Sequence, residues 1–162
     1  MPQLNRLRHF SYIAEELLLF VLDTRGIMAT FAAFLQSFME VDNNTAAARL
    51  VETVTKGIQE KKGRGITIID LRGIEGAITQ FFVVCQGNSP SQVEAIAESV
   101  GTTVREELGD KPTAVAGLGL SHWVAMDFTD VMVHVFVPQM REFYDIEGLW
   151  EDAETTQVPD ID

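Results

Sequence analysis

The stretch Trp123-Val-Ala-Met-Asp-Phe-Thr-Asp-Val-Met-Val-His-Val-Phe136 decides the fold of this chain. It consists of two apolar runs joined by a short polar turn, which is the pattern of a β-hairpin. The turn contains an aromatic residue, Phe128, where Gly, Asn, Asp or Ser is usual because those residues suit turn geometry. The Phe128 ring therefore either packs back onto the sheet or stays in solvent for a partner.

The first regular element before the hairpin is predicted to be a helix. Apolar residues recur at helical spacing over residues 47–58 and form one apolar stripe. Asn44 or Thr45 can cap the start of this helix, and Gly63 after two lysines can end it. A strand is expected next, over residues 66–71.

Two further strands and two further helices are predicted around the hairpin. Residues 81–86 are apolar at nearly every position, which indicates a central strand covered on both faces. The sequence Ser-Pro-Ser-Gln beginning at Ser89 is a well-formed helix start, and Gly109 ends that helix. A short strand is expected over residues 113–116, and a short helix over residues 138–144.

The predicted order of elements is helix, strand, strand, helix, strand, strand, strand and short helix. A crossover helix between adjacent strands favours an α/β fold, and the hairpin makes the sheet mixed. The expected fold is therefore a mixed β-sheet flanked by helices. We expect three parts along the chain: an extension over residues 1–38, a domain over 39–151 and an acidic, disordered tail over 152–162.

The extension contains two apolar runs, residues 17–22 and 27–35, which the charged segment at 23–25 interrupts. A membrane span needs ~20 unbroken apolar residues, and a signal peptide needs a small-residue cleavage site after its apolar centre, so we expect neither. Three interpretations stay open: an amphipathic extra helix, a genuine extension, or sequence translated upstream of the true start. Our hypothesis is that Met39 is the functional start.

Composition limits the partners of the chain. Its 162 residues, 46% of them hydrophobic, suit one folded domain. The net charge of −12 makes it a poor binder of bare nucleic acid, because it repels phosphates. The same charge suits docking onto a basic protein surface, although acidity can serve solubility alone.

The single cysteine, Cys85, cannot form an internal disulfide, which fits a reducing compartment, and we expect a cytoplasmic protein. Its apolar neighbours should bury it and raise its pKa, which argues against a catalytic nucleophile. One cysteine and three scattered histidines do not form a zinc ligand set. We therefore expect neither a metal nor a cofactor.

Four segments together resemble the ribosomal silencing factor family, also called Iojap-like. They are Gly65–Gly73, Phe82–Ser89, the hairpin Trp123–Phe136 and Arg141–Trp150. The resemblance runs from about Thr45 to Glu151 and keeps the family's order and spacing. It implies a mixed sheet similar to that of nucleotidyltransferases.

The resemblance also implies a function without a catalytic group. Ribosomal silencing factors bind ribosomal protein fourteen of the large subunit and sterically prevent the joining of the two subunits, which lowers translation when nutrients are scarce. No bond is broken in this action. Members of the family are often dimeric in isolation, so a homodimer is compatible with the free protein.

Carried over by position, the family's docking surface falls on the hairpin. The residues are Trp123, Asp127, Phe128, Thr129 and Asp130. Aromatic anchors supply most of the binding energy at small interfaces, and flanking carboxylates would steer the protein toward a basic partner. Thr129 stands where family members commonly have Gly. Because Thr resists positive φ, we expect a different type of turn here.

The likeness to nucleotidyltransferases leaves an enzyme acting on nucleotides as an alternative. Gly87-Asn88-Ser89 before a capped helix could bind an anion, but no Lys or Arg is near to hold a phosphate. Asp127 and Asp130 are separated across a turn, so they need not converge on one magnesium ion. Asp70 stands alone among apolar neighbours.

Other polar residues have ordinary structural explanations. His134 lies within a strand and is expected to be a satisfied, half-buried residue, while Asp145 and Glu147 are expected at a solvated edge. A third alternative is a generic dimerisation or interaction module, because apolar hairpins can pair edge to edge.

Mass spectrometry of the native N-terminus tests the hypothesis about Met39. If translation starts there, the first peptide begins at or just after Met39 and nothing upstream is detected. Abundant peptides from residues 10–25 would contradict it.

Overall fold

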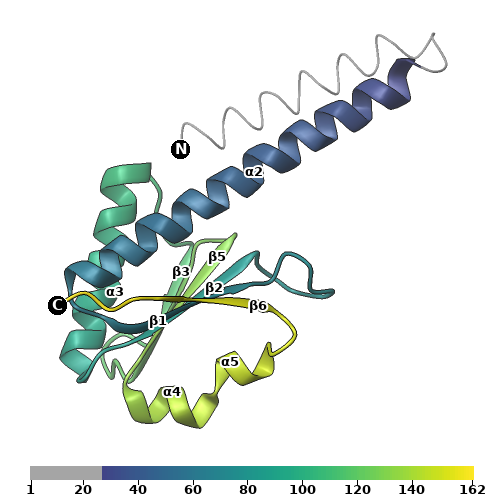
Figure 1. Ribbon diagram of the computed structural model, residues 1–162. Coiled ribbons are helices and arrows are strands. Elements are labelled where there is room, and N and C mark those ends of the chain that lie inside the picture. The colour runs from purple at the N-terminus through teal and green to yellow at the C-terminus, as the bar shows by residue number, and fades with distance from the viewer. Residues whose placement is uncertain (1–26) are drawn as a thin grey trace. The chain divides into compact units, whose positions relative to one another are not determined.

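The computed structural model describes residues 27–162 (Figure 1). The predicted apolar run 17–22 and the charged segment after it lie outside the described residues. The chain divides into two units after Ala46, and the unit that contains the sheet comprises Ala47–Asp162. Within residues 27–162, no helix has both the length and the apolarity that crossing a membrane requires.

Helix α2 spans Ile27–Glu60, so the predicted start at Asn44 or Thr45 is wrong. The helix continues through both residues without a break, and their capping chemistry is not used to begin it. The helix ends before Gly63, as predicted, but the left-handed residue of its last turn is Lys62. Lys62 adopts the left-handed conformation with φ +55°, and the Gly63 N–H donates to the Ile58 carbonyl over 3.0 Å, which closes the last turn.

The six strands form one mixed sheet in the order β3-β4-β5-β2-β1-β6. Their bounds are β1 Arg64–Asp70, β2 Phe81–Gln86, β3 Ala114–Ala116, β4 Trp123–Asp127, β5 Val131–Phe136 and β6 Glu154–Val158. All neighbours are antiparallel except β2 and β5, which are parallel. The expected hairpin β4–β5 and the central position of β2 are both confirmed.

Two features of the topology differ from the prediction. The tail predicted over residues 152–162 is not disordered, because β6 pairs with β1 from Ile66↔Val158 to Asp70↔Glu154. The domain therefore continues beyond residue 151. The helix that follows β2 does not connect adjacent strands either, since it leads to β3 at the far edge of the sheet.

Helix α3 spans Pro90–Leu108 and begins as predicted. The Ser89 hydroxyl accepts from the Gln92 N–H over 3.2 Å, and the Gln92 side chain accepts from the Asn88 N–H over 2.8 Å. Gly109 ends the helix in the left-handed conformation, with φ +65°.

The sheet is covered on both faces (Figure 1). Helix α3 and the part of α2 from Ala47 onward cover one face and enclose the larger core, which includes Cys85. Burial raises the pKa of the Cys85 thiol to about 12, which agrees with the prediction that it is not a nucleophile. The short helices α4 (Pro138–Tyr144) and α5 (Ile146–Leu149) lie on the other face, over a smaller core.

The close packing of α2 on α3 depends on Gly57. The Ser99 hydroxyl donates to the Gly57 carbonyl over 2.8 Å, and a Cβ on Gly57 would lie 2.9 Å from the Val100 Cα. We expect Gly57→Ala to lower the free energy of unfolding by about 1–2 kcal/mol despite alanine's better helix propensity, because the added methyl forces the helices apart.

Gly101→Ala is the matched control for this prediction. A Cβ on Gly101 would meet only the Met126 Cε, at an ordinary 3.6 Å, so the substitution should be neutral or stabilise by up to about 1 kcal/mol. Urea unfolding of both variants measures the difference. Equal stabilities would show that α2 and α3 are not in close contact at Gly57.

Candidate functional site

The turn between β4 and β5 holds Thr129 in the left-handed conformation. Its φ is +74°, so the expectation that Thr would avoid positive φ here is wrong. Two side chains hold the strained peptide in place. The Asp127 carboxylate accepts from the Thr129 N–H over 2.7 Å, and the Thr79 hydroxyl donates to the Thr129 carbonyl over 3.1 Å.

Phe128 packs back onto the sheet. Its side chain is 4% exposed and belongs to the larger core, beneath α2 and α3. The ring is therefore not available as an exposed anchor. The sequence contained a signal for this direction, because Val124, Met126 and Phe128 are apolar at every second position and face the same core.

The two aspartates of the turn serve the turn itself. Asp127 caps the Thr129 N–H, and the Asp130 carboxylate accepts from the Gln80 side-chain amide over 3.0 Å. The Asp130 carbonyl also accepts from the backbone N–H groups of Gln80 and Phe81. Both carboxylates remain partly exposed, and the tip is tied to the start of β2. Within the described residues, no three potential ligands cluster to hold a metal ion.

Trp123 lies on the opposite face of the sheet from Phe128. The half-buried indole stacks on Phe136, with ring centroids 5.0 Å apart and planes at 20°, and contacts Tyr144 at 4.7 Å. Its N–H donates to His134 Nδ1 over 3.2 Å. Of the five residues predicted from the hairpin, Trp123 and Asp127 therefore share one face, while Phe128 faces the other.

Two exposed aromatic residues beside Trp123 were not predicted as site residues. Phe143 is 77% exposed and Tyr144 is 44% exposed, and their rings meet edge to face at 5.1 Å. Together with Trp123 they form a continuous surface from β4 to the end of α4, here called the aromatic face. An aromatic pair at the end of a short helix was visible in the sequence, but its place beside Trp123 was not.

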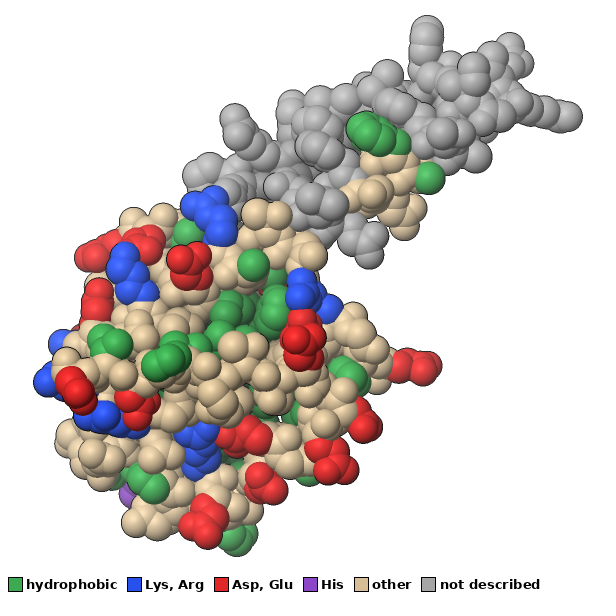
Figure 2. Space-filling model, viewed as in Figure 1, with side chains coloured by type: hydrophobic (Ala, Val, Ile, Leu, Met, Phe, Trp, Pro, Cys, Tyr) green, Lys and Arg blue, Asp and Glu red, His purple; other side chains and the backbone are tan. Residues whose placement is uncertain are grey.

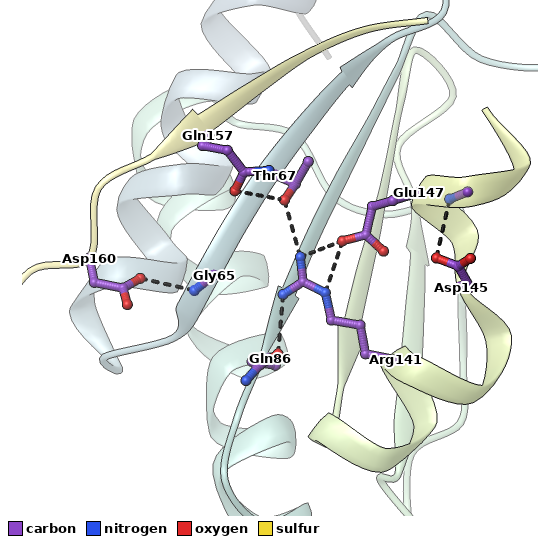
Figure 3. A network of polar contacts seen from close by, with 9 residues as sticks. Gly65, Thr67, Gln86, Arg141, Asp145, Glu147, Gln157 and Asp160 are labelled. Carbon is purple, nitrogen blue, oxygen red and sulfur yellow. Dashed lines mark hydrogen bonds and ion pairs between the residues drawn. The ribbon is translucent and has the colours of Figure 1, made fainter. Parts of the chain in front are cut away.

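A partly buried polar network fixes α4 against the sheet (Figure 3). Arg141 of α4 donates to Glu147 over 2.9 Å, to the Gln86 side chain over 3.3 Å and to the Thr67 hydroxyl over 3.1 Å. Thr67 in turn donates to Gln157 of β6 over 3.1 Å. Arg141 thus joins α4 and α5 to β1 and β2.

This network corrects the expectation of a solvated edge at Asp145 and Glu147. Glu147 is the ion-pair partner of Arg141 and is largely enclosed. Asp145 has φ +41°, and its side chain accepts from the Gly148 N–H over 3.3 Å, which caps the start of α5. Both acids therefore have structural partners.

The residues weighed for catalysis are also engaged elsewhere. Asp70 pairs with Arg72, and the hydrogen bond from that guanidinium lowers the pKa of the carboxyl. The Gly87 N–H donates to the Phe136 carbonyl over 2.9 Å, and the Asn88 N–H donates to Gln92, so these two amides of the turn are occupied. His134 is 5% exposed, rather than half-buried as expected.

The fold and this site define a mixed α/β domain that presents an aromatic face on one side of its sheet. The chain belongs to the ribosomal silencing factor family, since the family model described as "Ribosomal silencing factor during starvation" matches residues 44–162. This match confirms the predicted resemblance.

Individual relatives agree with the family assignment. The chain is 34% identical over 112 residues to the ribosomal silencing factor of Halalkalibacterium halodurans, which covers 69% of this chain and 94% of that protein. It is 33% identical to the Bacillus subtilis factor over 64% of this chain and 86% of that protein. A crystal structure from Chromobacterium violaceum matches with a TM-score of 0.61 and 31% identity, over 70% of this chain and 90% of that one. The names of the two curated relatives describe a regulatory role.

Burial lowers the pKa of His134 to about 4, against a weaker opposing effect of the Glu147 carboxylate. The unfolded chain, with an ordinary histidine pKa near 6.5, therefore binds a proton that the folded protein excludes. Stability should fall as the pH drops from about 6.5 toward 4, by about 2 kcal/mol at pH 5. His134→Asn should lose this part of the acid sensitivity.

Urea unfolding at pH 7.5 and pH 5.0 checks this prediction. The carboxylates titrate in both proteins, so the informative quantity is the difference between the wild type and the His134→Asn variant. The same loss of stability in both would show that His134 titrates normally in the folded protein.

Proposed function

We propose that this protein binds the large ribosomal subunit through ribosomal protein fourteen and sterically blocks the joining of the small and large subunits. This action would repress translation under nutrient limitation. Membership of the ribosomal silencing factor family supports the ribosomal role. The exposed aromatic face carries the docking part of the proposal. On this account the protein is not an enzyme, needs no cofactor and acts in the cytoplasm.

The aromatic face has the properties of a binding surface. Phe143 and Tyr144 expose large apolar rings, and binding a partner would remove that area from water. The Tyr144 ring already contacts those of Trp123 and Phe143. Because the Arg141 network also holds α4, little conformational entropy remains to be lost on binding.

The hairpin tip is a second part of the proposed docking surface, at the other end of β4 from Trp123. Asp127, Thr129 and Asp130 are half-buried or exposed, and the two carboxylates lie where they can meet a basic partner. Figure 2 shows further acidic side chains on the right-hand and lower parts of the visible face, where Figure 1 places the β1–β2 connection and α5. Such charge increases the rate of encounter with a positively charged ribosomal protein. Phe128 supports the tip from within the core.

A second copy of the chain is a further partner of the free protein in this proposal. Strand β3 is an edge strand of three exposed residues, none of them charged. Edge strands without charges or proline are open to pairing with another strand. A homodimer formed there would leave the aromatic face uncovered.

Phe143→Ala is the sharpest test of the docking face, because its ring is exposed and its removal should not unfold the protein. We expect this variant, and also Trp123→Ala, to bind purified large subunits about tenfold more weakly or worse. Both should lose the ability to block subunit joining. Co-sedimentation with large subunits and a subunit-joining assay measure the two effects.

Ile161→Ala is the matched control, since Ile161 is an exposed apolar residue outside the aromatic face. It should bind and block as the wild type does. Phe128→Ala is unsuitable as a docking variant, because removing a buried ring costs about 3–5 kcal/mol of stability. Normal binding by both Phe143→Ala and Trp123→Ala would show that the aromatic face does not dock.

A further inference from the structure

His134 lies directly beneath the aromatic face, on β5. The strand register pairs Trp123 with Phe136 and Ala125 with His134, so the imidazole is a diagonal cross-strand neighbour of the indole. The Trp123 N–H donates to His134 Nδ1 over 3.2 Å. An accepting nitrogen carries no proton, so the neutral imidazole must hold its proton on Nε2.

The other nitrogen of His134 has an unusual environment. Nε2 is buried and has no hydrogen-bond partner among the residues that the structure describes. The ring is packed among Phe82, Phe136 and Trp123, with the Phe82 ring edge to face at 4.9 Å. A buried donor without a partner destabilises the folded state. A leucine would fill such an apolar site without this penalty, so packing alone does not explain a histidine here.

We propose that His134 is a positioning residue for the aromatic face, with its Nδ1 fixing the orientation of the Trp123 indole for docking. Stacking on Phe136 fixes the plane of the Trp123 indole. The indole could still lie in that plane with either of its two edges directed toward the protein. The hydrogen bond to Nδ1 selects the edge that carries the N–H. Since Tyr144 packs on this indole, its ring is oriented as well. A face ordered before binding loses less entropy when the partner arrives.

This inference rests on the proposed docking role of the aromatic face, and three variants separate the two ideas. His134→Leu removes the acceptor and keeps an apolar side chain. His134→Asn offers a side-chain oxygen close to the position of Nδ1. Trp123→Ala removes the docking ring itself and identifies the Trp123 indole resonance by its loss from the proton–nitrogen NMR spectrum.

We expect His134→Leu to shift the Trp123 indole N–H resonance, speed its hydrogen exchange and weaken binding to purified large subunits about tenfold. A tenfold change corresponds to about 1.4 kcal/mol, the size of one net hydrogen bond. His134→Asn should restore the resonance and most of the affinity. The indole resonance of Trp150 should stay in place throughout.

The stability of His134→Leu separates positioning from folding. Because this variant removes a buried unpaired N–H, it should unfold at the same urea concentration as the wild type or higher. Weaker binding by a protein of equal or greater stability supports the positioning role.

Two results would overturn the inference and leave the proposed function intact. One is wild-type binding by His134→Leu while Trp123→Ala fails to bind. The other is binding by His134→Asn no better than that of His134→Leu. Normal binding by both Trp123→Ala and Phe143→Ala would instead remove the docking face, and the inference with it.

Discussion

The alternation of side chains along β4 and β5 is the constraint on which the site depends. Successive residues of a strand point to opposite faces of the sheet, so one hairpin builds two surfaces. Phe128 closes the larger core on one face, while Trp123 joins the aromatic face on the other. A shift of one residue in register would exchange the two sets. The pairing that buries the core therefore also presents the indole, and neither property can change without the other.

Helix α4 depends on the polar network around Arg141, because a helix this short is not stable without tertiary contacts. It has seven residues and no buried side chain, and short helices are marginal without tertiary contacts. Arg141 supplies those contacts, since one guanidinium reaches β1, β2 and α5 together. Gly65 on β1 leaves room for it, because a Cβ there would lie 2.7 Å from Arg141 Nη1. A larger residue at Gly65 would therefore have to displace the end of the Arg141 side chain.

Helices and strands whose ends or burial depend on neighbouring residues in the sequence could be predicted from the sequence. The Ser89 cap, the Gly109 stop and the continuous apolar run of β2 could all be recognised in the sequence. So could the inward direction of Phe128, from its spacing after Val124 and Met126 of β4. Strand β6 could not, because its side chains are mostly exposed and polar, and its order comes from backbone pairing with β1. The site follows the same division. The family resemblance indicated Trp123. Phe143 and Tyr144 could not be assigned to the same surface from the sequence, because their proximity to Trp123 depends on how α4 packs.

The turn before α3 resembles a phosphate-binding turn, but in this chain its backbone connects β2 to β5. A glycine-containing turn before a helix binds anions when its N–H groups point outward and unpaired. In this chain the Gly87 N–H donates to the Phe136 carbonyl, which ties the end of β2 to the end of β5. The Asn88 N–H is taken by the Gln92 side chain. Because Phe136 is the residue on which Trp123 stacks, this turn supports the aromatic face. A turn before a helix can therefore support a neighbouring surface when its backbone donors are used internally.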